Sequence, residues 1–100
     1  KIRFTIPVGV AYGSDTELVR KILLDVTYSH PSILKEPEPD VIFKEFAESS
    51  LNFELRAWLP SPLGRIMVMS DLNYAIDKAF RENNINIPFK QIDIHLINGK

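Results

Sequence analysis

Residues 49–59 carry the clearest hydrophobic pattern in the chain. Through SSLNFELRAWL, leucine, phenylalanine and alanine alternate with three polar residues and one tryptophan. Successive side chains of a strand point to opposite faces of a sheet, so this alternation predicts a strand with one buried face and one open face. A sheet covered on one side only is antiparallel or mixed. We therefore expect function to depend on what the open face and the helices behind the sheet contact.

Two further segments are predicted to pair with this strand. Residues 2–10 alternate as regularly, whereas the pattern of residues 41–47 is less clean. In the latter segment Ile42, Phe43 and Phe46 cannot all lie on one face, which predicts a bulge or burial on both faces. The short connection to the next strand predicts a hairpin.

Two helices and a last strand complete the predicted elements. Ser-Asp-Thr-Glu matches a capping box, with Ser14 as the N-cap and Glu17 reaching back, and the helix that follows should end shortly before Pro31. Apolar residues at helical spacing predict a second helix at about residues 63–83. Alternation at residues 91–97 predicts a final strand.

The order strand, helix, strand, strand, helix, strand is that of the split βαβ, or ferredoxin-like, arrangement. The predicted fold class is therefore α+β, a four-stranded antiparallel sheet with two helices on one face and the first and third strands in the centre. A chain of 100 residues can form one core, so residues 1–100 are expected to be a single domain. The start at Lys1 raises the expectation that the domain is a fragment of a longer protein.

Composition excludes several kinds of chemistry. The formal net charge of −1 argues against a general nucleic-acid binder, which needs a basic surface. The absence of cysteine excludes disulfides, thiolate metal sites and cysteine nucleophiles. No P-loop, dinucleotide fingerprint or Ser/His/Asp arrangement is present, and no apolar run reaches the roughly 20 residues that span a bilayer. We expect no enzymatic activity, no catalytic residue and no cofactor.

Two groups of residues share features with metal sites. His95 and Asp93 could share a strand face, but a solvated histidine–aspartate pair is the simpler interpretation, and His30 is expected at the C-terminal end of the first helix. Prolines separate the carboxylates of residues 36–40, which favours a solvated loop over a calcium site. No metal site is predicted.

Several stretches together resemble the C-terminal cytoplasmic domain of small-conductance mechanosensitive (MscS-type) channels. They are VGVAYGSD at residues 8–15, HPSILKEPEP at 30–39, EFAESSLNFELRAWL at 45–59, and INIPF with DIHL within 85–96. Their order and spacing carry the resemblance. One departure is Lys90, where the family usually has proline.

The resemblance implies a homoheptameric channel in the inner membrane, opened by tension during osmotic downshift. Its pore would lie in upstream segments absent from this chain. The present domain would lie on the cytoplasmic side and form the wall of a hollow cage, contributing to assembly, solute filtering and gating modulation. Arg56 and Trp58, bulky residues of the open face, are the expected subunit contacts.

One alternative from another functional class stays open. The ferredoxin-like fold has many uses, so the chain could be a soluble regulatory module that binds a small ligand or dimerises through its sheet. Nucleic-acid binding is not expected, because Trp58 is the one aromatic residue on the open face of the first and third strands.

Overall fold

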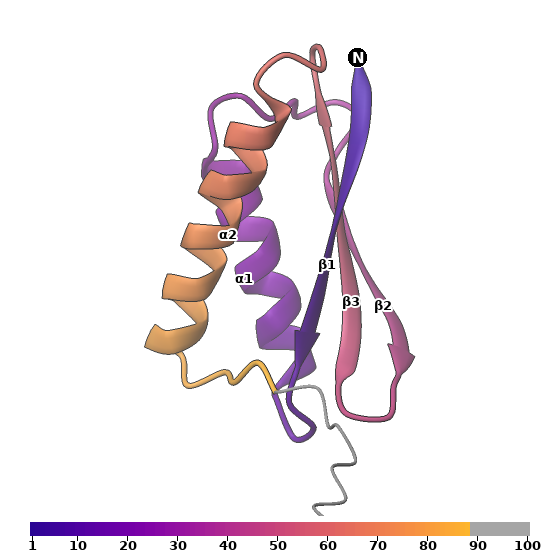
Figure 1. Ribbon diagram of the computed structural model, residues 1–100, viewed down its shortest axis with the longest axis vertical. Helices are drawn as coiled ribbons and strands as arrows, with labels where there is room; N and C mark the ends of the chain where they lie inside the picture. Colours follow the sequence, from indigo (N-terminus) through magenta and orange to yellow (C-terminus); the bar gives the residue numbers. More distant parts are fainter. Residues whose placement is uncertain (89–100) are drawn as a thin grey trace, which may run out of the picture.

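The computed structural model describes residues 1–88 of the chain. Three strands form one antiparallel sheet, and two helices cover one of its faces (Figure 1). The elements are, in order, β1 (Ile2–Val10), α1 (Thr16–Ser29), β2 (Asp40–Phe46), β3 (Leu51–Leu59) and α2 (Arg65–Glu82). This confirms the predicted α+β class and the two helices. The predicted last strand, residues 91–97, lies outside the described residues, so the fourth strand and the complete ferredoxin-like topology stay predictions.

β3 is the central strand of the described sheet, whose order is β1-β3-β2. It pairs with β1 along its whole length, from Leu51 opposite Val10 to Leu59 opposite Ile2. The central position predicted for the first strand depends on a fourth strand beside it and stays a prediction. The hairpin between β2 and β3 is confirmed.

The core lies between the sheet and the helices. Every second residue of β3 is buried, as the alternation predicted, and the residues between them are half-buried on the other face. The helices contribute residues at helical spacing. The core positions with the least exposure are Val10, Val19, Leu23, Phe53, Leu55, Ala57, Leu59, Leu72 and Phe80.

The N-cap of α1 is Asp15, so the prediction of Ser14 was wrong by one residue. The Asp15 carboxylate accepts a hydrogen bond from the Leu18 backbone N–H at 3.1 Å. The Ser14 hydroxyl instead donates to the Ala11 carbonyl at 2.6 Å, which closes the turn that leaves β1. Gly13 adopts a φ of 90° in this turn, a conformation that glycine tolerates without strain.

β2 is exposed along most of its length. The predicted bulge is present as a register shift between Phe43 and Glu45. Burial on both faces, the alternative explanation of the pattern, was wrong: Phe43 is 39% exposed and Phe46 is 74% exposed. β2 lies at the edge of the sheet, so its residues on the helix side extend beyond the cover that α1 provides.

Candidate interaction surfaces

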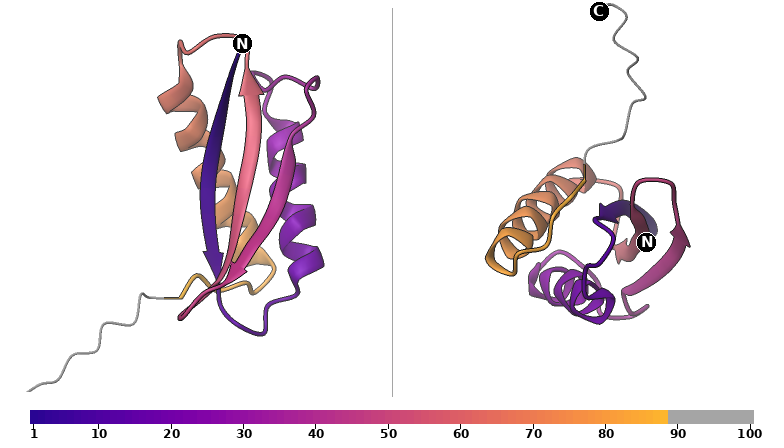
Figure 2. Two further views of the ribbon diagram at one scale, coloured as in Figure 1. Left: turned by 90° about the vertical axis from the view of Figure 1, so that its right-hand side faces the viewer. Right: turned by 90° about the horizontal axis from the view of Figure 1, so that it is seen from below.

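The first candidate surface is the face of the sheet opposite the helices, seen from the front in Figure 2 (left). On β3 it carries Asn52, Glu54, Arg56 and Trp58, all half-buried. These residues are held in place by pairing with the two flanking strands, so their positions follow from the register of the sheet. Sequence alternation therefore identified this face correctly.

Arg56 forms a two-pronged ion pair with Asp40 across the β2–β3 pair. Its Nε donates to Oδ1 at 2.8 Å and a terminal nitrogen donates to Oδ2 at 2.7 Å. These hydrogen bonds are the main reason that the pKa of Asp40 is lowered, and they raise the pKa of Arg56. The guanidinium predicted to contact another subunit is thus already engaged within its own chain.

Other polar pairs continue across the same two strands. Lys44 Nζ lies 3.1 Å from Glu54 Oε2, and the Asn52 amide donates to Glu45 Oε2 at 3.1 Å. Exposed pairs of this kind each contribute little to stability. Lys44 and Arg56 are thereby paired, whereas Arg3, on the same face of β1, is exposed and forms no ion pair within residues 1–88.

Trp58 lies near the end of the open face, opposite Arg3 in the register. Its side chain is half-buried, and its carbonyl accepts a hydrogen bond from the Leu34 N–H at 3.0 Å. The connector between α1 and β2 is thereby fixed beside the end of β3. Contact between Trp58 and another subunit stays a prediction.

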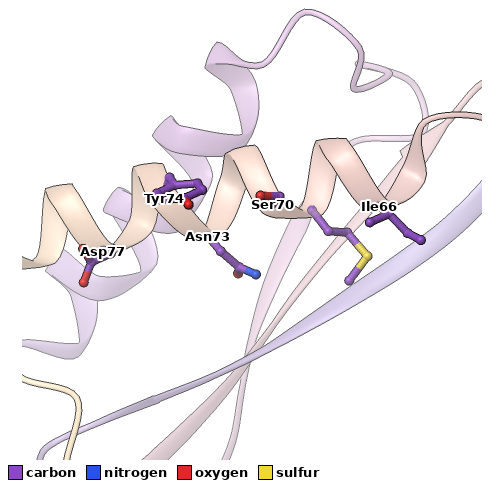
Figure 3. Close-up of a pocket in the computed structure, with 6 residues that line it drawn as sticks. Ile66, Ser70, Asn73, Tyr74 and Asp77 are labelled. Atoms are coloured by element: carbon purple, nitrogen blue, oxygen red, sulfur yellow. The ribbon is translucent and has the colours of Figure 1, made fainter.

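The second candidate surface lies on the outer side of α2 and was not predicted. Ile66 is 77% exposed and Tyr74 is 76% exposed. With their helical neighbours they line an open groove of about 580 Å³ (Figure 3). We call this surface the α2 stripe: Ile66, Met69, Ser70, Asn73, Tyr74 and Asp77.

The spacing of the α2 stripe was visible in the sequence. Its members recur at intervals of three or four residues, which places them on one side of a helix. The apolar residues of the buried side dominate the periodicity of this segment, so the second set of positions was not predicted. Among residues 1–88 only α2 lines the groove, so polar groups from different described elements do not converge there, and the groove gives the small-ligand alternative no specific support.

The third candidate surface is the exposed helix-side margin of β2. Phe43 stacks on the buried Phe53 with ring centroids 4.6 Å apart, and Phe46 lies against Phe43 at 5.0 Å. Tyr12, 52% exposed, donates its hydroxyl to the carbonyl of Ala47, which follows Phe46 in the chain. We call Phe43, Phe46 and Tyr12 the β2 margin.

His30 and Asp71 join the two helices at the other end of the domain. His30 is the C-cap of α1, as predicted. The Ser32 N–H donates to its Nδ1 at 3.1 Å, so in the neutral ring the proton is on Nε2, which lies 2.9 Å from Asp71 Oδ2. The pair was not predicted, because 41 residues separate its members. It borders a hollow of about 440 Å³ that Leu63 and Met67 also line.

Residues 1–88 contain neither a metal-binding cluster nor a helix able to span a membrane. No group of three or more histidine, aspartate or glutamate residues in this range could hold a metal ion. Neither of its helices is long and apolar enough to cross a membrane. His95 and Asp93 lie outside the described residues.

Comparison with known proteins gives one family throughout. The family model described as "Mechanosensitive ion channel MscS, C-terminal" matches residues 4–87. The chain is 46% identical over 98 residues to mechanosensitive channel MscK of Escherichia coli, covering 98% of the chain and 9% of that protein. It is 38% identical over 96 residues to the small-conductance mechanosensitive channel of Edwardsiella ictaluri, covering 96% of the chain and 33% of that protein.

A solved structure extends the similarity to three dimensions. The crystal structure of Helicobacter pylori MscS in the closed state matches with a TM-score of 0.82 and 38% sequence identity. The match covers 98% of the chain and 39% of that structure. The chain therefore spans only a minor part of the proteins it resembles.

Proposed function

Since the chain belongs to the MscS family of mechanosensitive channels, within which residues 4–87 match the C-terminal domain, we propose that it forms the wall of a cytoplasmic cage in such a channel. The observation that carries this proposal is the match of nearly the whole chain to a closed MscS structure. In this role the domain contributes to assembly, to solute filtering and to modulation of gating. No step of catalysis is assigned to it.

The charge distribution supports a role in a passage with weak ionic preference. The net charge of −1 is small, and on the open face Arg56 and Lys44 are paired with Asp40 and Glu54. Paired charges produce a weaker field over a surface than unpaired charges of one sign. A wall of this kind would admit solutes of either charge while excluding large ones.

Self-assembly into a homoheptamer is part of the proposal. The parent channel would lie in the inner membrane through segments upstream of this chain, with the present domain on the cytoplasmic side. The open face would then meet a neighbouring subunit or the solution inside the cage. Trp58 is the better contact candidate of the two predicted residues, because Arg56 is engaged with Asp40.

The proposal is tested by recording tension-evoked currents from patches that contain the full-length protein. Deletion of residues 1–100 should reduce the number of active channels or change their closing kinetics. Quantification of the protein in the same membranes separates lost assembly from lost expression. Currents with unchanged size, number and kinetics would contradict a role in assembly and gating.

A further inference from the structure

We infer that the α2 stripe of one copy packs against the β2 margin of the next copy, so that a single contact repeats around the ring. This inference rests on the proposed function, because it requires that several copies assemble. It adds which two surfaces meet, which neither the family match nor the structural similarity specifies. Four observations on the described residues support it.

Both surfaces expose large apolar side chains that the other residues of the described range, 1–88, leave uncovered. Ile66, Tyr74 and Phe46 are each about three-quarters exposed, at 77%, 76% and 74%. The core-facing side of α2 is a separate set of residues, Val68, Leu72, Ile76 and Phe80. Contiguous exposed apolar surface on a soluble domain commonly marks a contact with a partner.

The two surfaces also lie on opposite sides of the domain. The sheet order is β1-β3-β2, so β1 and β2 form its two outer strands within the described residues. In Figure 2 (left) α2 lies behind the β1 side, whereas β2 lies on the other side with α1 behind it. A closed ring of more than two copies needs two different surfaces facing opposite neighbours, which is the arrangement seen here.

The charged group of the α2 stripe and the hydroxyl of the β2 margin already have partners. Asp77, the one charged member of the α2 stripe, is paired with Arg81. The Tyr12 hydroxyl donates to the Ala47 carbonyl. Desolvation of an unpaired charge is the larger cost of covering a surface, and the Asp77 pair lowers it, whereas the polar side chains of Ser70, Asn73 and Tyr74 would need partners within the contact.

The two surfaces are small, which fits a contact that forms only when other segments already hold the copies in a ring. Aromatic side chains bury about 150–250 Å² each, so the few large residues on each side amount to several hundred Å² per copy. Stable pairs of proteins bury about 800 Å² per partner. The contact would therefore be weak between isolated domains and effective where other segments hold the copies together.

Cysteine cross-linking tests the inference directly, because the chain contains no cysteine. In the full-length protein in native membranes, with any cysteines elsewhere replaced, Phe46→Cys and Tyr74→Cys are introduced separately and together. A short bis-maleimide should link the double variant into a ladder that ends at the complete ring. Each single variant should remain unlinked, since each supplies one half of the contact.

Matched controls separate the possible outcomes. Lys21→Cys combined with Tyr74→Cys uses a side chain on α1 about as exposed as Phe46, at 71%, and should give no ladder. Linking by Tyr74→Cys alone would show a symmetric helix-to-helix contact and overturn the inference. An unlinked double variant whose oligomer is still captured by an amine-reactive cross-linker would overturn this contact while leaving the proposed function intact. Absence of any oligomer with both reagents would overturn the assembly itself.

Discussion

Leu55 and Phe46 are both large apolar residues of the sheet, but they are expected to contribute very differently to stability. Leu55 is fully buried in the central strand, so Leu55→Ala should lower the free energy of unfolding by about 2–5 kcal/mol. Phe46→Ala removes a mainly exposed ring and should cost less than about 1 kcal/mol. Urea denaturation measures both values. Equal losses would show that Phe46 belongs to the core and would remove the β2 margin as a free surface.

Asp40 makes the stability of the domain depend on pH. Its pKa is lowered in the folded chain by hydrogen bonds from Arg56, so the pair stabilises the fold above the ordinary pKa of aspartate, near 4. The stabilisation is lost as the pH falls through the lower folded-state pKa. Asp40→Asn should therefore reduce the melting temperature at pH 7 and make progressively less difference below about pH 4.

Thermal denaturation of the Asp40→Asn variant and the wild type at pH 7 and at pH 2.5 measures this pH dependence. Glu38→Gln, a change in the exposed connector, controls for the loss of one carboxylate. A difference between Asp40→Asn and the wild type that is the same at pH 7 and pH 2.5 would contradict the role of the ion pair.

For single residues, the hydrogen-bond or ion-pair partner of a side chain was the least predictable feature. The position of Arg56 on the open face followed from alternation, but its partner Asp40 depends on a register that includes the bulge between Phe43 and Glu45. His30 was placed correctly at the end of its helix, but Asp71 comes from a distant helix. Local pattern specifies the face of a side chain, whereas its partner depends on how separate elements pack.

The start of α1 was also predicted only approximately, one residue too early. The capping role of Asp15 can be tested directly. Because the Asp15 carboxylate caps the helix, Asp15→Ala should cost about 0.5–2 kcal/mol of unfolding free energy. Asp15→Asn should retain most of the stability, since asparagine caps equally well. Denaturant titration compares the two variants, and hydrogen exchange at the Leu18 amide reports on the cap itself. A loss for Asp15→Asn as large as that for Asp15→Ala would contradict capping by this side chain.

The elements themselves were largely predictable, for a physical reason. β3 and β1 alternate because one face packs on helices and the other does not, and periodicity reports this difference directly. β2 was harder, because it is an outer strand of the described sheet and only a few of its residues, such as Val41 and Phe43, contact the core. The outer side of α2 was missed because its most exposed apolar residues, Ile66 and Tyr74, are not part of the core formed by residues 1–88.

For the whole molecule, we predict that the isolated 100-residue chain is monomeric or only weakly self-associating. The exposed surfaces on α2 and β2 are too small to hold two free copies together against the loss of their independent motion. Light scattering at micromolar concentration measures the mass. A stable heptamer of the isolated chain would show that this domain assembles without help from other segments.

The family was identifiable from the order and spacing of short motifs, and the comparisons confirm it. The hydrophobic pattern alone identifies an α+β domain with a one-sided sheet but not its function, since this architecture serves many functions. The proposed heptamer and its contacts depend on surfaces that residues 1–88 of a single copy leave exposed.

The native mass of the full-length protein, extracted from membranes in mild detergent, tests the central claim most directly. The intact protein should give a mass of seven copies. The form that lacks residues 1–100 should give fewer complete rings at equal expression. A monomeric intact protein, or complete rings that form equally well without these residues, would contradict the assignment of this domain to the wall of an assembled cage.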